Sequence, residues 1–145
     1  MRLILLSQVH EVRDSCLCLA TQRAARRLAR RFDKAFRPVG LTNQQFSLLM
    51  PLNAPQPQPM RALADLMGMD RTTLTAALKA LQRRGLVEVG RDARDRRARR
   101  LQLTQAGRAA LAAALPIWRA EHARIESEIT PAGAGALRAA LRPVV

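Results

Sequence analysis

Several residue types on which many proteins depend are scarce in this chain of 145 residues. It has two cysteines, three phenylalanines, one tryptophan and no tyrosine. Two cysteines cannot form the disulfide framework of a small secreted scaffold. The only histidines, His10 and His122, lack the spacing of a metal site. We find no Ser-His-Asp set, no paired carboxylates and no phosphate-binding glycine loop, so we expect no enzymatic activity, no cofactor and no metal.

Long apolar runs are also missing. The run from Leu3 to Leu6 is too short for the core of a signal peptide. The alanine-rich stretch from Ala109 to Ile117 is too short to cross a bilayer. We therefore expect a cytoplasmic protein with no membrane partner. Residues 1 to about 12 have no clear pattern, and we treat them as a tail of uncertain structure.

Positive charge, by contrast, is abundant. Lysine and arginine together number 25 against 11 acidic residues, a formal net charge of +14. Such a surface attracts polyanions, chiefly nucleic acid or an anionic membrane surface. Six arginines fall within residues 91–100, between apolar segments at 86–89 and 101–103, and the two strands are predicted at 86–89 and 99–103. This pattern predicts a β-hairpin that carries positive charge at its tip.

The rest of the chain has mainly helical patterns. Apolar residues at helical spacing predict a first helix from Val12 to about Phe36. Capping residues and glycines then mark four more helices, and alternate prolines mark an extended connector at 55–59. The predicted helices are 43–52 after Thr42, 60–67 before Gly68, 71–84 between Asp70 and Gly85, and 104–129 with a kink at Pro116. A last helix is predicted from Thr130 and Pro131 to about Leu141.

The helix predicted over 71–84 has two distinct faces. Leu74, Ala77, Leu78 and Leu81 share an apolar face that must pack inward. The opposite face suits the major groove of DNA, since hydroxyls and guanidinium groups reach base edges and phosphates and the helix N-terminus favours phosphate. A solvated face without a ligand is the alternative interpretation, but the preceding short helix, the tight turn and the basic hairpin favour a helix-turn-helix. The candidate contact residues are Arg71, Thr72, Thr73, Thr75 and Lys79, with Ala76 and Arg83 on the same face.

The basic hairpin contains two acidic residues, which distinguish it from a simple charge run. We expect the carboxylates of Asp92 and Asp95 each to bond the side chain of the arginine two residues further on and to hold it extended. An oriented guanidinium fits a narrow A·T-rich minor groove, where the negative potential is strongest. The hairpin is therefore predicted to be a DNA-contacting wing.

These segments together resemble the MarR family of bacterial transcription regulators. The matching pieces are L41-T-N-Q-Q-F46, D70-R-T-T-L-T75, R84-G-L-V87, D92-A-R-D-R-R97 and L103-T-Q-A-G-R108, in the family's order and spacing. The resemblance implies one mainly α-helical domain over 1–145 with a small β-hairpin wing. The winged helix-turn-helix would occupy 42–103, and helices at 12–36 and 104–142 would interlock in a homodimer that reads successive major grooves.

The resemblance also implies roles for the wing residues. The wing matches the family's D-x-R-D-x-R pattern. By that match Arg97 is expected to enter the minor groove with Asp95 holding it, while Arg94 and Arg96 would meet phosphates.

The expected function is a repressor that a small aromatic or anionic effector releases from a pseudo-palindromic operator. Arg23, Arg26 and Arg27 are candidates for holding an anionic effector, although such arginines are commonly only solvated. One alternative is a redox sensor that uses Cys18, whose position resembles the reactive cysteine of the hydroperoxide-sensing branch of the family. That branch holds its cysteine with tyrosines, which this chain lacks. Another alternative is a non-specific architectural DNA-binding protein.

Overall fold

The computed structural model describes residues 3–95, 98–129 and 133–145. The chain begins with two helices, α1 (Leu6–Ser15) and α2 (Leu17–Ala35). A central lobe follows, made of α3 (Asn43–Leu52), β1 (Gln58–Pro59), α4 (Met60–Met67), α5 (Arg71–Arg83), β2 (Val87–Arg91) and β3 (Arg99–Leu103). The chain closes with the long helix α6 (Gln105–Glu128) and with α7 (Gly133–Leu141).

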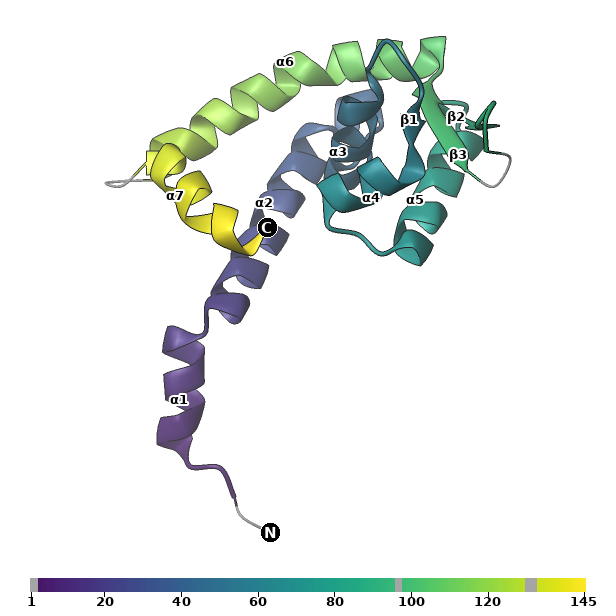
Figure 1. Ribbon diagram of the computed structural model, residues 1–145. Helices are drawn as coiled ribbons and strands as arrows, with labels where there is room; N and C mark the ends of the chain where they lie inside the picture. Colours follow the sequence, from purple (N-terminus) through teal and green to yellow (C-terminus); the bar gives the residue numbers. More distant parts are fainter. Residues whose placement is uncertain (1–2, 96–97, 130–132) are drawn as a thin grey trace.

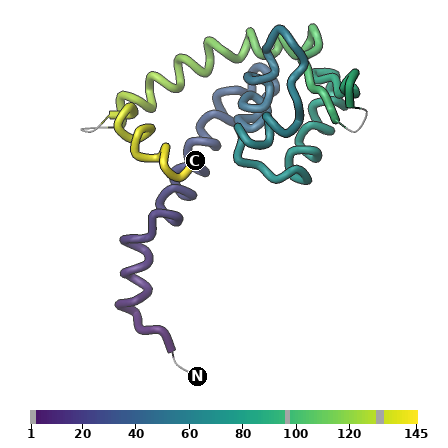
Figure 2. Tube along the Cα trace, in the orientation of Figure 1, coloured from purple at the N-terminus to yellow at the C-terminus, as the bar shows by residue number. Residues whose placement is uncertain are grey.

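The central lobe is contacted by α6 and by the end of α2. Figure 1 shows α6 arching over this lobe, the end of α2 entering it, and α1 projecting away from the rest of the molecule. The Cα trace in Figure 2 shows the same separation of α1 from the body. Within the lobe, three antiparallel strands pair in the order β1-β3-β2, with Val89 opposite Leu101. The fold is mainly α-helical with a small β-sheet, as the sequence predicts.

The hydrophobic core lies inside the central lobe. Phe36 at the end of α2, Leu49 of α3, Leu78 of α5 and Leu101 of β3 are each 2% exposed or less. Leu111, Ala114 and Ile125 of α6 join this cluster from above. The lobe is thus closed by its own side chains together with the ends of α2 and α6.

The predicted helix boundaries in the lobe are confirmed by their caps. The hydroxyl oxygen of Thr42 accepts a hydrogen bond from the backbone amide of Gln45, and the side-chain oxygen of Gln45 accepts one from the backbone amide of Thr42. Gly68 ends α4 with a φ of 59°, a left-handed conformation that costs glycine little. Thr104 likewise caps α6 by accepting from the amide of Gly107. Local side chains therefore decide where these helices begin and end.

The structure differs from the sequence-based predictions at four places, in the N-terminal region, the connector and the hairpin. The presumed tail contains α1, and the helix predicted over 12–36 is broken at Cys16, whose backbone is extended (φ −74°, ψ 108°). The connector contributes a short strand, β1, because Gln58 and Pro59 pair with Leu101 and Arg100. The second strand lies at 87–91 rather than 86–89.

The remaining expectations concern α6, α7 and the membrane. α6 continues through Pro116, and α7 begins at Gly133, while Thr130 and Pro131 lie outside the described residues. No helix within those residues combines the length and the apolar content needed to cross a membrane.

Candidate nucleic-acid interface

Helix α5 presents the two faces that its sequence predicts. Leu74, Leu78 and Leu81 are 2% exposed or less and pack into the core. On the opposite side, Arg71, Thr72 and Lys79 are exposed. α5 is therefore anchored by one face and offers a polar, positively charged face to a ligand.

The turn between α4 and α5 positions the start of α5. Asp70 accepts hydrogen bonds from the backbone amide and the hydroxyl of Thr73, at 2.8 and 2.6 Å. These bonds, first of all the one from the Thr73 hydroxyl, lower the pKa of Asp70. The hydroxyl of Thr75 donates to the backbone oxygen of Arg71 at 2.7 Å. Two of the predicted contact residues thus already use their hydroxyls inside the helix, and Thr73 serves as a partner of the cap.

The wing is organised by Asp92. Its Oδ1 accepts the backbone amides of Arg94 at 2.7 Å and Asp95 at 3.1 Å, and its Oδ2 accepts Nε of Arg100. These bonds, of which the Arg94 amide contributes most and the Arg100 side chain next, lower the pKa of Asp92 to about 2. Arg100 also donates to the backbone oxygen of Pro57 at 3.4 Å. One carboxylate therefore fixes the loop and ties it, through Arg100, to the connector.

The predicted pairing of Asp92 with the side chain of Arg94 is wrong. The hairpin brings the backbone of Asp92 against Ala98, with the amide donating to the Ala98 oxygen at 3.1 Å. Arg100 on the neighbouring strand is consequently within reach of the carboxylate. Of the other wing candidates, Asp95 and Arg94 are exposed, while Arg96 and Arg97 lie outside the described residues.

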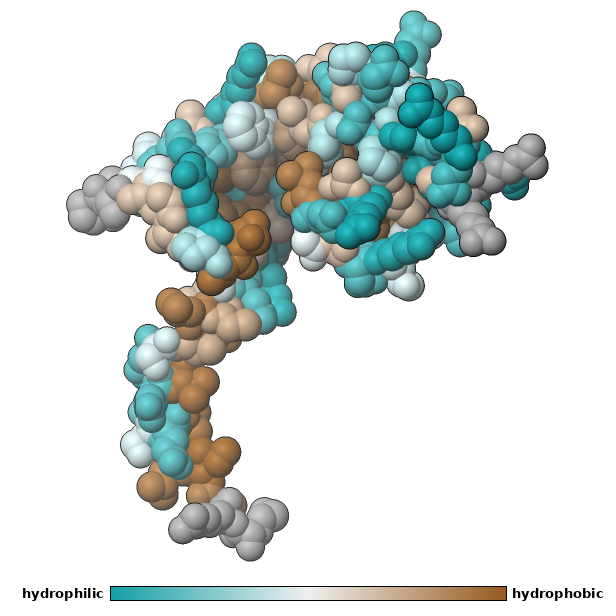
Figure 3. All heavy atoms as spheres, viewed as in Figure 1, coloured by the Kyte–Doolittle hydropathy of each residue, from teal (hydrophilic) through white to brown (hydrophobic). Residues whose placement is uncertain are grey.

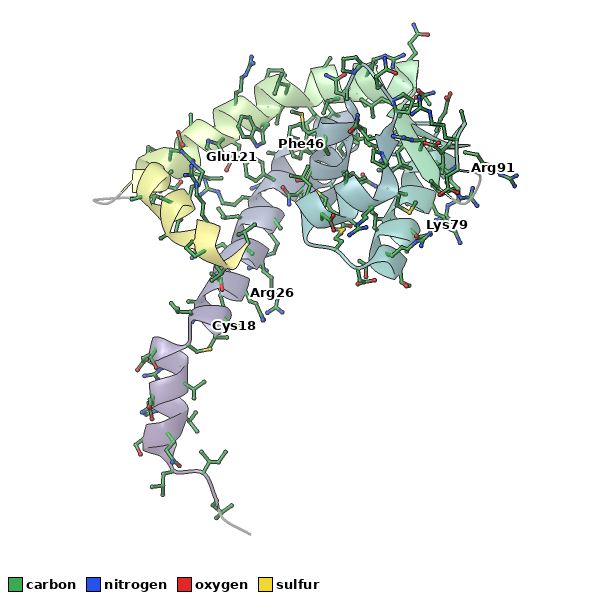
Figure 4. The ribbon with its side chains drawn as sticks, viewed as in Figure 1. Cys18, Arg26, Phe46, Lys79, Arg91 and Glu121 are labelled. Atoms are coloured by element: carbon green, nitrogen blue, oxygen red, sulfur yellow. The ribbon has the colours of Figure 1, made fainter. Side chains whose placement is uncertain are left out.

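Sequence reasoning missed one basic residue beside α5. Arg99 lines a hollow of about 280 Å³ together with Arg71, Thr75 and Lys79. Alternation along β3 could have found it, since Arg99 shares a strand face with the buried Leu101. Figure 4 shows Lys79 of α5 and Arg91 of β2 on the same end of the molecule. The helix and the wing thus form one continuous basic surface.

A second basic surface lies on α2, away from the first. Arg23, Arg26 and Arg27 are exposed and line a shallow hollow of about 600 Å³ with Ala20, Ala24 and Arg30. Figure 4 shows Arg26 on the stretch of α2 that leaves the central lobe. The three predicted effector residues therefore stand close together on one helix.

Both cysteines are free thiols near the start of α2. Cys18 is exposed, and its Sγ accepts a hydrogen bond from Nε2 of Gln22 at 3.1 Å. Cys16 lies at the break between α1 and α2, where its Sγ accepts from the amide of Leu19 at 3.4 Å. The expectation that both lie within one continuous helix is wrong for Cys16.

An apolar cleft separates the central lobe from α6, and the sequence pattern did not predict it. Its volume is about 480 Å³. It is lined by residues of α3, α4 and α6, namely Phe46, Ser47, Met50, Pro51, Leu66, Met67, Leu115 and Trp118. Figure 3 shows the apolar surface in the hollow between α6 and the lobe. A lining without charged side chains suits an apolar or aromatic group.

A helix-turn-helix with a basic wing is the architecture of DNA-binding regulators, and the comparisons with known proteins agree. The sequence model of the MarR family matches residues 41–98. MosR, an M. tuberculosis transcriptional regulator solved in complex with DNA, is 40% identical over 90% of this chain and 93% of its own, with a TM-score of 0.82. No curated protein matches the sequence.

The repressor CouR is similar in two structures. Bound to a 23-mer DNA duplex it is 31% identical, covers 99% of this chain and 96% of its own, and has a TM-score of 0.73. Bound to p-coumaroyl-CoA it is 29% identical, with coverages of 98% and 97% and a TM-score of 0.80. The chain belongs to the MarR family and is a DNA-binding transcriptional regulator.

Proposed function

We propose that the protein is a homodimeric repressor that binds a pseudo-palindromic operator and leaves it when a small effector binds. The observation that carries the proposal is the single basic surface formed by the exposed face of α5 and the wing, with Arg71, Lys79 and Arg99 around one hollow. A helix of this kind enters the major groove while the wing reaches the neighbouring minor groove. Paired copies then read two half-sites about one helical turn apart.

The DNA contacts divide between bases and backbone. In this proposal Arg71, Thr72, Thr75 and Lys79 face the major groove, while Thr73 acts near the helix N-terminus beside a phosphate. In the wing, Arg94 and Arg96 meet phosphates, and Arg97, held by Asp95, enters the minor groove.

The wing assignment is testable by comparing two alanine variants. Arg97→Ala is expected to weaken binding most at sites with A·T-rich flanks, whereas Arg94→Ala weakens binding similarly at all sites. The reverse pattern would move the groove-inserting role to Arg94.

Homodimer formation is supported by apolar surface at the two ends of the chain. Leu6, Val9 and Val12 of α1 are 69%, 51% and 58% exposed, and Leu137 of α7 is 45% exposed. Exposed apolar stripes of this kind mark interfaces. In the proposed homodimer, residues 12–36 and 104–142 of the two copies interlock, and α1 extends this interface. The interface would cover these exposed apolar side chains.

The effector site is proposed to be the apolar cleft between the lobe and α6. The cleft contains no charged residue, so the acidic group of an anionic effector would need partners outside it. Arg23, Arg26 and Arg27, which line a separate hollow on α2, are the proposed partners. The repressor CouR, which binds p-coumaroyl-CoA, suggests a first probe. Trp118 is the only tryptophan and lines the cleft, so its fluorescence reports occupancy directly.

The effector proposal is tested by titrating p-coumaroyl-CoA and benzoate while following Trp118 fluorescence and DNA release. Met50→Phe would place a bulkier ring in the cleft without adding a second tryptophan, and it is expected to weaken effector binding and release. Arg26→Ala is expected to weaken an anionic probe, whereas Arg119→Ala, which removes an exposed arginine elsewhere, should not. Equal effects of the two arginine variants would dismiss Arg26 as an effector contact.

Thiol chemistry is a second candidate for the trigger, because Cys18 is exposed and accepts a hydrogen bond from Gln22. Peroxide should then release DNA from the wild type and not from Cys18→Ser. Release that persists unchanged in the variant dismisses Cys18.

The DNA-binding proposal itself is tested by selection from random duplexes followed by footprinting. The expected result is one enriched sequence, protected with twofold symmetry, that is bound far more tightly than a scrambled duplex at the same salt concentration. Equal affinity for both duplexes would instead identify a non-specific architectural DNA-binding protein.

A further inference from the structure

One arginine connects the two helices that link the central lobe to the rest of the molecule. Arg31 of α2 donates Nε to Glu121 of α6 at 2.8 Å. Its Nη1 and Nη2 donate to both carboxylate oxygens of Glu128 at 2.5 and 2.9 Å. Glu121 and Glu128 are two helical turns apart, so a single planar guanidinium bridges both. We call these three residues the Arg31 clamp.

One member of the Arg31 clamp, Glu121, is shielded from water. Glu121 is 9% exposed and is the only charged residue classed as buried within 3–95, 98–129 and 133–145. The side chain of Arg31 is 29% exposed, and that of Glu128 is 59% exposed. Figure 4 places Glu121 on α6. Each oxygen of this buried carboxylate has its own arginine partner, Arg31 at 2.8 Å and Arg124 at 3.3 Å, so loss of Arg31 would leave the oxygen that faces α2 without its partner.

The clamp stands beside the aromatic contacts that carry α6 on the lobe. Phe32, the residue after Arg31, stacks on Phe36 with ring centroids 5.7 Å apart, and Phe36 stacks on Phe46 at 4.8 Å. Phe46 in turn faces Trp118 of α6 at 6.4 Å. Rings can slide over one another, whereas three directed N–H bonds allow one arrangement. The clamp therefore adds three directed bonds to the apolar packing between α2 and α6.

We propose that Arg31 is a positioning residue for DNA recognition: with Glu121 and Glu128 it holds α6 at one angle on α2 and so sets the spacing of the two α5 helices in the dimer. The inference rests on the proposed homodimer and its operator. Specific binding needs both helices in successive major grooves. Non-specific binding depends on the total positive charge of the protein, so the spacing of the two α5 helices does not affect it.

The test is Arg31→Lys, which keeps the charge but loses the planar fork that reaches both carboxylates. Affinity for the selected operator is expected to fall about tenfold or more, a size typical of positional coupling. Affinity for a scrambled duplex at the same salt should change less than twofold. Arg124→Lys is the matched control, since Arg124 also contacts Glu121, at 3.3 Å, but is 72% exposed and lies on α6 itself. It should leave both affinities unchanged.

Glu128→Gln is a second variant that should not disturb folding, since the side chain of Glu128 is largely exposed. It is expected to reproduce part of the loss of specificity. Thermal unfolding and dimer mass are measured for every variant. Equal loss on both duplexes, or no loss on either, overturns the inference. A wild type that does not dimerise or does not prefer any operator overturns the proposed function instead, so the two failures are distinguishable.

Discussion

The central lobe buries most of its apolar side chains, whereas the helix α1 exposes its own. In the lobe, Leu49, Leu78 and Leu101 are nearly inaccessible to water, and α3 and α5 each begin at a side-chain cap. In α1, no residue is buried, although its apolar side chains line up on one face as Figure 3 shows. A ten-residue helix is marginal in water without packing. The lobe is therefore closed by residues of one chain, whereas α1 leaves an apolar face that the proposed second copy would cover.

The largest expected effect is on dimerisation through the apolar face of α1. Val9→Asp combined with Val12→Asp places two charges on the apolar face of α1 and is expected to weaken dimerisation by about a hundredfold or more, since burying unpaired charge is costly. Sedimentation measures the dissociation constant. Ser7→Asp combined with Gln8→Asp is the control on the polar face, and an unchanged dimer in both variants would contradict the comparison.

A smaller effect separates the two regions within the monomer. Leu49→Ala is expected to lower the free energy of unfolding by about 3 kcal/mol, because it leaves a cavity in a closed core. Leu6→Ala, at a position that is 69% exposed, should cost less than about 0.5 kcal/mol at concentrations where the protein is monomeric. Denaturant unfolding at low and high protein concentration distinguishes the regions. A cost for Leu6→Ala that does not depend on concentration would show that α1 is stabilised within one chain.

Two glycines differ in how closely the rest of the protein approaches them. A Cβ on Gly107 would lie 2.0 Å from the backbone oxygen of Leu86, whereas one on Gly135 of α7 would meet nothing within 4 Å. Gly107→Ala is expected to destabilise the protein by about 1–3 kcal/mol, because α6 must move away from the wing. Gly135→Ala should instead stabilise α7 slightly, by about 0.5 kcal/mol. Thermal unfolding of both variants measures the difference, and similar melting temperatures would refute the close approach.

The smallest expected effect concerns the wing and pH. Hydrogen bonds lower the pKa of Asp92 from 3.8 to about 2 in the folded protein. The stabilisation is therefore fully present above about pH 4, the unfolded pKa, and is lost as the pH falls through about 2. Asp92→Asn is expected to remove this dependence and to weaken DNA binding a few-fold, because the wing loses its tie to Arg100. Hydrogen exchange of the Arg94 and Asp95 amides reports whether Asp92 holds the loop. Unchanged protection in the variant would show that it does not.

Much of the central lobe could be predicted from the sequence because its signals are local. Thr42, Asp70 and Thr104 bond amides three residues away, and Gly68 needs only its own backbone freedom. The apolar face of α5 follows from helical spacing alone. The same local signals placed Arg71, Thr72 and Lys79 on the exposed face of the candidate interface.

Features that depend on neighbours distant in sequence could not be predicted in this way. Spacing along the wing suggested that Asp92 pairs with Arg94, but the hairpin places Arg100 beside it. The contacts of Arg31 with Glu121 and Glu128 join residues that are 90 and 97 positions apart. The apolar cleft likewise forms only where α3 and α4 meet α6, which lies far along the chain from both.

By itself, the sequence determined the order of the helices, their caps, the basic wing and the family to which the protein belongs. These depend on residues within one or two helical turns of each other, where backbone geometry dictates which groups meet. Only the tertiary structure decided that the connector pairs as a strand, that the first helix breaks at Cys16 and that one arginine joins α2 to α6. Those outcomes depend on which surfaces pack together, and packing is settled by the whole fold rather than by any one segment.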